Sequence, residues 1–168
     1  MDGEALRSLQ APLKETYRED PERAVVTLRA QGTLDGDGIT CKVDTGRALA
    51  VAGLHPATGG SGVELCSGDM LLEALVACAG VTLRAVSTAL AFRLGPNAMV
   101  SAEGDLDFRG TLGVAKDAAV GFRNIRLSFD LDTDEDDERI ATVLKLTERY
   151  CVVLQTIAVT PELSVATA

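Results

Sequence analysis

The run LLEALVACAG, residues 71–80, decides the fold of this 168-residue chain. It follows Ser67-Gly68-Asp69, whose side-chain oxygens suit the N-cap of a helix, and it continues as an apolar segment to Ala91. Helical spacing places on one face Leu71, Leu75, Cys78, Thr82 and Ala85, and the opposite face is also mostly apolar. Such a helix is normally enclosed on most sides. The sequence therefore predicts a long central helix over about residues 69–92, with Cys78 packed against a neighbour.

A second helix is predicted over about residues 137–157, around the run TERYCVVL at 147–154. The acidic stretch Asp130 to Glu138 precedes it, where negative charge favours a helix N-terminus. One predicted face carries Ile140, Leu144, Thr147, Cys151, Leu154 and Ala158. Two packed helices that each carry one thiol can bring two sulfurs together. That is the arrangement a peroxidatic and a resolving cysteine require.

The remaining elements are predicted to be strands, apart from an exposed N-terminal helix. This helix covers residues 3–18 and ends at Asp20-Pro21. Strands are expected from residue 24, at 39–43 after the DGDG turn of residues 35–38, and at 47–52, 99–109, 120–131 and 161–166. Strands followed by long helices predict an α+β protein. We expect an N-terminal helical extension over residues 1–23 and one domain over residues 24–168.

Composition excludes several classes of function. The net charge of −9 and the lack of a basic stripe argue against nucleic acid as a partner. The apolar stretch 70–91 approaches the length of a membrane span, but Glu73 and Arg84 would be costly at membrane depth, so no membrane partner is expected. No signal peptide is visible at the N-terminus. We expect a cytoplasmic protein, in a compartment that keeps thiols reduced.

Metal and cofactor chemistry finds no support in the motifs. The chain has a single histidine and no CxxC pair, and the aspartates from Asp130 lack the later ligands of a calcium loop, so neither a metal nor a cofactor is expected. His55 could pair with a cysteine as a general base, but its place beside Pro56 favours an ordinary surface residue. Cys41 is interpreted as a core residue of its strand, and Cys66 as a loop thiol.

Cys78 and Cys151 have polar neighbours that an inert core cysteine would not need. Thr82 follows Cys78 by one helical turn, and Glu148 precedes Cys151 by about one turn. A peroxidatic cysteine needs a depressed pKa, because the thiolate is the nucleophile. A nearby arginine would lower that pKa and would also bind the leaving oxygen.

Two motifs in this chain resemble the OsmC/Ohr family of thiol-dependent hydroperoxide reductases. The first runs from Gly59-Gly60 through Ser67-Gly68-Asp69 to Cys78, and the second is Glu148-Arg149-Tyr150-Cys151, which resembles Ala-Glu-x-x-Cys. The resemblance covers about residues 24–166. The chain carries Ser67-Gly68, with Asp69 one position later, where the reductases have Pro-Glu, and it carries Val152 where they have proline. These features resemble the divergent OsmC-like branch.

The resemblance implies an OsmC-like fold in an intertwined homodimer. Two curved antiparallel sheets would wrap the long cysteine-bearing helices, with two active sites at the interface. Cys78 would attack an organic hydroperoxide to form a sulfenic acid, and Cys151 would resolve it to a disulfide. A dithiol reductant such as a lipoyl group would then reduce the disulfide. The activating cation would be Arg29, or alternatively Arg47, and Asp69 and Glu148 are the acidic residues expected in this site.

Three functions stay open on the sequence. The first is a peroxidase that protects against oxidative stress by reducing organic hydroperoxides. The second is a non-catalytic OsmC-like protein that binds a hydrophobic small molecule at the dimer interface. The third is an acyl or thioester hydrolase with Cys78 as nucleophile. Sulfurs within disulfide reach, with an arginine close to Cys78, would favour the first; cysteines sealed from any cleft would favour the second.

Overall fold

The computed structural model describes residues 2–5, 7–8, 10–11, 19, 31–34, 40–44, 49–113 and 115–167. The chain divides into two compact parts. The helical part comprises residues 1–18, 74–101 and 127–168, and the sheet part comprises residues 19–73 and 102–126. The long helix α2 (Ser67–Ala89) begins in the sheet part and continues into the helical part. Each part is described by itself.

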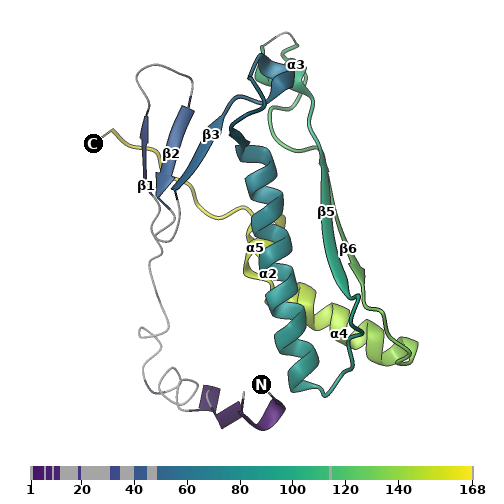
Figure 1. The fold of residues 1–168 in the computed structure, drawn as a ribbon. Coiled ribbons are helices and arrows are strands. Elements are labelled where there is room, and N and C mark those ends of the chain that lie inside the picture. The colour runs from purple at the N-terminus through teal and green to yellow at the C-terminus, as the bar shows by residue number, and fades with distance from the viewer. Residues whose placement is uncertain are drawn as a thin grey trace. The chain divides into compact units, whose positions relative to one another are not determined.

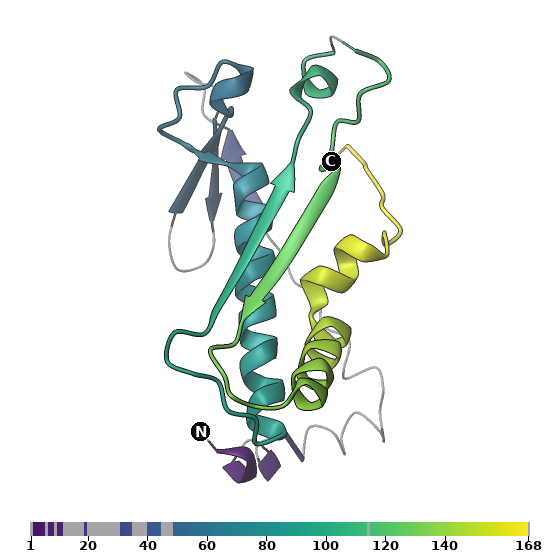
Figure 2. The same cartoon turned by 90° about the vertical axis from the view of Figure 1, so that its right-hand side faces the viewer.

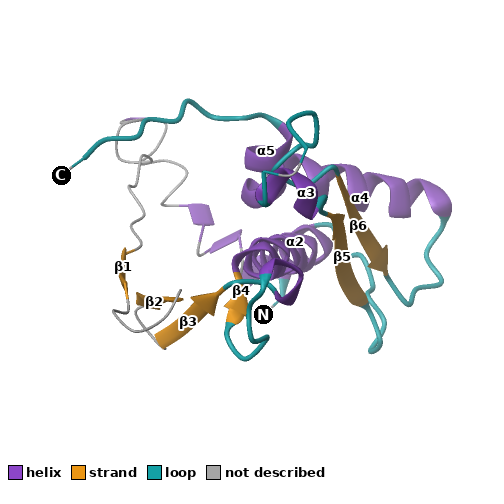
Figure 3. Cartoon of the chain, turned by 90° about the horizontal axis from the view of Figure 1, so that it is seen from above, coloured by secondary structure: helices purple, strands orange, loops and turns teal. Residues whose placement is uncertain are grey.

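The sheet part contains a four-stranded sheet in the order β1-β2-β3-β4 (Figures 1 and 3). Its strands are β1 (Gln31–Leu34), β2 (Thr40–Asp44), β3 (Leu49–Gly53) and β4 (Leu65–Cys66). β1, β2 and β3 pair antiparallel, with Leu34 opposite Cys41, whereas the turn predicted at residues 35–38 lies outside the described residues. β4 instead pairs parallel with β3. The sheet is therefore mixed and not purely antiparallel, because the connection over residues 54–64 returns the chain before β4 begins.

A separate two-stranded sheet pairs β5 (Met99–Asp105) with β6 (Asn124–Asp130), which run in opposite directions in Figure 2. Exposed and half-buried side chains alternate along both strands, which is the period of a sheet with one solvated face. Arg126 on β6 donates to both oxygens of Asp105 on β5, at 2.7 and 2.9 Å. The short helix α3 (Phe108–Thr111) lies in the connection between the strands. The two strands predicted on either side of residue 110 are confirmed.

The core of the helical part lies between α2 and α4 (Asp137–Tyr150), and α4 lies across α2 at a steep angle (Figures 1 and 3). Asp136 caps α4 by accepting the Arg139 backbone N–H at 2.8 Å, and Asp137 and Glu138 occupy the first turn. The acidic stretch thus ends in the helix start that the sequence predicted. The buried core consists of Leu83, Phe92, Leu131 and Val143, with Val86, Leu94, Val100, Phe129, Ile140 and Leu144 packed against it.

The expectation that α2 is enclosed on most sides is wrong for the single chain. Its buried stripe is Leu75, Ala79, Leu83 and Ser87, which shares only Leu75 with the predicted face, and Leu71 is exposed. Only 22% of the most apolar stretch of α2 is buried, and Val81 is 72% exposed. By length and composition alone, α2 could cross a membrane. One chain of this size covers only one face of so apolar a helix.

The second predicted helix is interrupted at Cys151. α4 ends at Tyr150, Cys151 has an extended backbone (φ −74°, ψ 103°), and α5 (Val152–Ala158) begins directly afterwards. Cys151 therefore lies between two helices instead of inside one.

The two ends of the chain differ in how they meet the predictions. The strand predicted at residues 161–166 is wrong, because this segment has no regular structure and is exposed, with no strand pairing to it. Near the N-terminus, residues 3–5, 7–8 and 10–11 are helical, and Asp2 accepts the Ala5 backbone N–H at 2.8 Å. The predicted boundary at residue 23 lies outside the described residues.

Candidate functional site

The helical part brings the Cys78 and Cys151 thiols within hydrogen-bonding reach of each other. Cys78 lies on α2 and is half-buried, whereas Cys151 is completely buried between α4 and α5. Neither cysteine is in a disulfide. The two thiols that the sequence singled out therefore form one site, with one sulfur partly open and the other sealed.

The interruption at Cys151 creates additional hydrogen-bond donors for Cys78. The Cys151 N–H still donates to the Thr147 carbonyl at 3.0 Å, and its carbonyl accepts the Gln155 N–H at 2.9 Å. The first N–H groups of α5 have no acceptor within their own helix. Those of Val152 and Val153 lie close enough to the Cys78 sulfur to lower its pKa. The local backbone geometry thus directs two peptide N–H groups at one thiol.

The net effect of these surroundings is to lower the pKa of Cys78. Burial raises that pKa, because desolvation disfavours the thiolate. Hydrogen bonds from the Val153 N–H, the Cys151 thiol, the Val152 N–H and the Thr82 hydroxyl stabilise the thiolate and outweigh burial. A lowered pKa makes Cys78 more nucleophilic at neutral pH than an ordinary cysteine.

The pKa of Cys151 moves in the opposite direction. Burial raises the pKa of this thiol most, and a hydrogen bond from the Leu154 N–H opposes that effect. The hydrogen bond to Cys78 and the negative charge of the Cys78 thiolate raise the pKa further, and Val153 lowers it slightly, so the net direction is upward. Of the two thiols, Cys78 is therefore the one that ionises first as the pH rises.

Thr82 contributes to this site from one helical turn beyond Cys78. Its hydroxyl donates to the Cys78 main-chain carbonyl at 2.8 Å. The same hydroxyl is near enough to the Cys78 sulfur to stabilise the thiolate. The Thr82 hydroxyl has one proton and cannot donate it to both acceptors at once. The Cys78 thiolate and the Cys78 main-chain carbonyl therefore compete for this proton. The sequence had marked Thr82 as a neighbour without giving it a role.

The other predicted site residues do not join the thiol pair in the described structure. Asp69 is exposed in the first turn of α2 and belongs to the sheet part. Glu148 is exposed, and its main-chain carbonyl accepts the Gln155 side-chain amide N–H at 2.9 Å. Arg29 and Arg47 lie outside the described residues, so the activating cation stays a prediction. Within the described ranges, no three His, Cys, Asp or Glu side chains are grouped to hold a metal ion.

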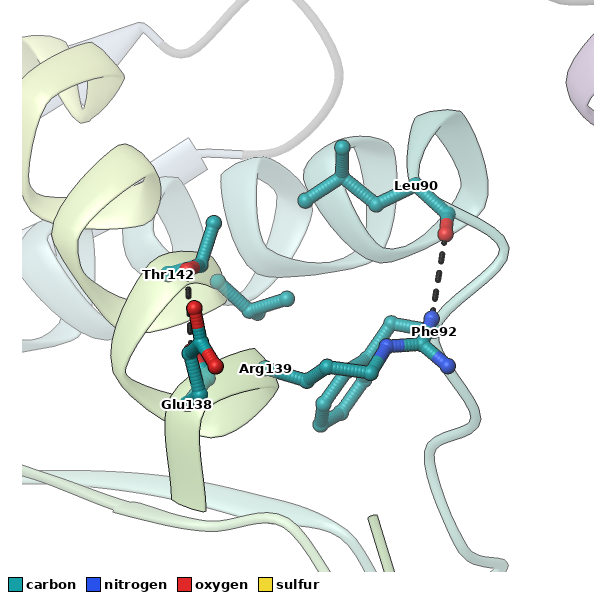
Figure 4. Close-up of a pocket in the computed structure, with 6 residues that line it drawn as sticks. Leu90, Phe92, Glu138, Arg139 and Thr142 are labelled. Carbon is teal, nitrogen blue, oxygen red and sulfur yellow. Dashed lines mark hydrogen bonds between the residues drawn. The ribbon is translucent and has the colours of Figure 1, made fainter. Parts of the chain in front are cut away.

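A cavity of about 220 Å³ lies where α4 contacts the end of α2, and the residues around it have a structural role. Arg139 reaches from α4 and donates to the carbonyls of Leu90 and Ala91 at 3.2 and 3.1 Å, which satisfies acceptors that the helix end leaves free (Figure 4). Its guanidinium also lies 5.8 Å from the centre of the Phe92 ring. These contacts attach α4 to α2 and offer no reactive group.

Sequence reasoning missed a second cysteine environment, which lies in the sheet part. Cys66 and His55 line the same cavity, of about 350 Å³, together with Phe108 and Phe122. His55 had been interpreted as a surface residue and Cys66 as a loop thiol. The signal that links them is spatial, because residues 53–68 and 106–122 meet only in the folded sheet part.

The structure is an α+β fold, and comparisons with known proteins agree with that fold class. A family model described as OsmC-like protein matches residues 59–166, which is well over half of the chain. The chain therefore belongs to the OsmC-like family. A search of curated proteins finds no match.

Solved structures show the same fold at low sequence identity. An OsmC-like protein from Mycoplasma pneumoniae matches with a TM-score of 0.65 and 15% identity, over 80% of this chain and 89% of that one. An organic hydroperoxide resistance protein OsmC from Legionella pneumophila matches with a TM-score of 0.60 and 15% identity, over 79% and 90%. The organic hydroperoxide resistance protein OhrB of Bacillus subtilis matches with a TM-score of 0.53 and 16% identity, over 77% and 90%. At these identities the likeness supports the fold.

Proposed function

We propose that this protein is a peroxidase that reduces organic hydroperoxides through Cys78 and Cys151. The observation that carries the proposal is the opposite pKa shift of two thiols in hydrogen-bonding reach, lowered for Cys78 and raised for Cys151. Membership of the OsmC-like family and the likeness to proteins named for organic hydroperoxide resistance support it. Partial exposure of Cys78 also fits a nucleophile that a substrate must reach.

In the first step, the Cys78 thiolate attacks one oxygen of the hydroperoxide. A sulfur–oxygen bond forms, the oxygen–oxygen bond breaks, and its electron pair leaves on the alkoxide, which becomes an alcohol on protonation. Cys78 is oxidised to a sulfenic acid and the hydroperoxide is reduced. The donors from Val152, Val153 and Thr82 hold the attacking sulfur as a thiolate before this step.

In the second step, Cys151 gives up its proton and attacks the Cys78 sulfur. The sulfur–sulfur bond forms, and hydroxide leaves and takes up a proton to become water. The retained proton on Cys151 is useful until then, because a thiolate there would oppose ionisation of Cys78. After Cys78 is oxidised, that opposition disappears and the pKa of Cys151 is expected to fall.

The proposal is tested by turnover of cumene hydroperoxide with dihydrolipoamide as reductant. Cys78→Ser is expected to abolish turnover, while Cys66→Ser, which changes a free cysteine outside the pair, keeps it. A sulfenic acid trapped by dimedone should map to Cys78 in the Cys151→Ser variant. Wild-type turnover in Cys78→Ser, or dimedone adducts confined to Cys66, would contradict the two-cysteine mechanism.

A cation close to Cys78 belongs to the same proposal, with Arg29 first and Arg47 second. Burial raises the pKa of Cys78 before any donor acts, and a positive charge would oppose that effect. Arg29→Ala should slow both Cys78 alkylation at neutral pH and hydroperoxide turnover, with the fold retained by circular dichroism. If neither rate changes, the same comparison is made with Arg47→Ala. If neither arginine matters, the backbone donors supply the activation alone.

We also propose that the functional form is a homodimer that covers α2. The exposed apolar residues Leu71 and Val81, at 40% and 72%, leave much of this helix uncovered in one chain. Permanent dimers commonly bury more than about 2,000 Å² and are more apolar than transient complexes. Val81→Glu is expected to shift the sedimentation coefficient toward the monomer, with Glu73→Gln as an exposed control on the same helix. A wild-type monomer at micromolar concentration would refute the dimer.

The reductant proposed for the disulfide is a small dithiol such as a lipoyl group. Cys151 is completely buried, so a reductant would meet the half-buried Cys78 sulfur first. Thiol–disulfide exchange requires direct attack on one sulfur, and a dithiol completes the exchange within one molecule. Free thiols of this kind suit the reducing cytoplasm.

A further inference from the structure

We propose a second ligand site, in the sheet part, that binds a neutral aromatic small molecule carrying a hydrogen-bond acceptor. The site is the cavity of about 350 Å³ shared by Cys66 and His55. Small-molecule pockets commonly measure about 300–1,000 Å³ and combine apolar walls with a few polar groups. The proposal goes beyond hydroperoxide reduction, since it uses neither Cys78 nor Cys151.

The walls of this cavity are mostly apolar and built from close contacts. They are formed by Leu54, Leu106, Phe108, Val120 and Phe122. Phe122 packs directly on the backbone of Gly104, where a Cβ atom would lie only 2.5 Å from the ring. Any larger residue at position 104 would displace that ring. The contact with Gly104 therefore holds the Phe122 ring in one position in the cavity wall.

The start of α2 forms the floor of the cavity at Gly68. A Cβ atom added there would lie 3.5 Å from both Leu106 and Phe122, and 3.6 Å from the Cys66 sulfur. These are ordinary van der Waals distances, so a small side chain fits without strain. A larger side chain at position 68 would enter the space between these three residues.

His55 supplies the polar group that would orient a ligand. Its Nδ1 accepts the Ala57 backbone N–H at 3.0 Å, so the neutral ring carries its proton on Nε2. The ring stacks on Phe108 with 4.8 Å between centroids and an interplanar angle of 16°. Nδ1 bonding and stacking together fix the ring. A fixed imidazole with one donor to offer favours a ligand with an acceptor such as a carbonyl oxygen.

The lining also determines the charge of the ligand. Among the described residues that line the cavity there is no Lys, Arg, Asp or Glu. A charged ligand would lose its hydration without gaining an ion pair, which is costly in an apolar site. Aromatic walls, the oriented imidazole of His55 and the hydroxyl groups of Thr58, Ser67 and Thr111 therefore select an uncharged ring compound with a hydrogen-bond acceptor.

Prodan, a neutral naphthalene ketone with environment-sensitive fluorescence, is a suitable probe. Titrating it into the full-length reduced protein should give saturable blue-shifted emission. Gly68→Leu should abolish this emission by filling the cavity, whereas the matched control Gly68→Ala should retain it. His55→Phe keeps an aromatic ring but removes the Nε2 proton, and should weaken binding by about three- to tenfold, the value of one hydrogen bond.

Site-resolved alkylation separates this site from the proposed peroxidase site. With N-ethylmaleimide and peptide mass spectrometry, bound prodan should slow modification of Cys66 and leave Cys78 unchanged. Binding should survive in Cys78→Ser, whatever that variant does to peroxide turnover. Protection of Cys78 instead of Cys66, loss of binding in Cys78→Ser, or absence of saturable binding to the wild type would each overturn the proposal.

Discussion

Cys78 and Cys66 are separated by twelve residues of sequence, yet their surroundings differ in every respect that matters to a thiol. Cys78 receives hydrogen bonds from two backbone N–H groups, a hydroxyl and a second thiol. Cys66 lines an apolar cavity beside a stacked imidazole. The comparison teaches that the groups around a cysteine, and not the cysteine itself, lower the pKa of the Cys78 thiol.

The largest effect that would test this contrast comes from removing the partner thiol with Cys151→Ala. Under dithiol recycling, we expect hydroperoxide turnover to fall by about two orders of magnitude, because the sulfenic acid on Cys78 has no partner for disulfide formation. The variant also loses one donor to Cys78, so the pKa of Cys78 should rise and its alkylation at neutral pH should slow. Steady-state kinetics and peptide-resolved alkylation measure the two effects.

Cys66 provides the control for that experiment. Its alkylation rate should be the same in wild type and Cys151→Ala, because the lost donor acts on Cys78 alone. Equal slowing at both cysteines would mean that the substitution had disturbed the fold instead of the thiol pair.

A smaller effect is expected when one backbone donor is removed with Val152→Pro. Proline lacks the N–H, is favoured at the first position of a helix, and is compatible with the extended backbone of Cys151 before it. Val152 is 70% exposed, so little packing is lost. Losing a hydrogen bond to a charged group should slow Cys78 alkylation at pH 7 by about tenfold, without stopping it.

Val152→Ala is the matched control, because it shortens the side chain and keeps the N–H. It should alkylate at the wild-type rate. If Val152→Pro and Val152→Ala react alike, the Val152 N–H does not stabilise the Cys78 thiolate, and the difference from Cys66 must have another origin.

Thr82→Val should have a still smaller effect, of about two- to threefold on Cys78 alkylation at pH 7, since the hydroxyl divides its proton between two acceptors. Thr82→Ser restores a hydroxyl and should recover the wild-type rate. Thr88→Val is the matched control: Thr88 makes the same bond to the carbonyl four residues earlier, at 2.8 Å, with arginine in place of cysteine there. An equal change in Thr88→Val would indicate a general effect on α2.

The sequence predicted where helices and strands occur better than it predicted how they are interrupted and paired. Helix α2 and both strands of the β5–β6 pair follow from strong periodicity, and the acidic cap at Asp136 follows from helix electrostatics. The break at Cys151 was missed, because TERYCVVL contains no glycine or proline to mark it. The parallel pairing of β4 was also missed, since a two-residue strand carries no pattern.

The candidate site, too, was predicted only in part. The family resemblance identified Cys78 and Cys151, and the structure places their thiols together. The donors from Val152 and Val153 were invisible in the sequence, because every residue except proline has a backbone N–H and only the break directs these two. The cavity shared by His55 and Cys66 was missed, because it depends on segments separated in sequence.

The smallest effect concerns the pH dependence of stability in the sheet part. Arg126 holds the pKa of Asp105 at about 2, below its ordinary value of 3.8, chiefly through hydrogen bonds, with Asn124 adding another. Because the folded-state pKa is depressed, the contribution of the ionised Asp105 to folding stability is present above pH 3.8 and is lost as the pH falls toward about 2.

Asp105→Asn should therefore be slightly less stable than wild type near neutral pH and should match it near pH 2. Urea unfolding followed at both pH values measures the difference, and Asp130→Asn, on the neighbouring strand, serves as the control. A stability difference between wild type and Asp105→Asn that is unchanged across this pH range would show that the Asp105–Arg126 pair adds nothing to the sheet part. Since both strands are exposed on this face, the effect should remain a fraction of that expected for a buried pair.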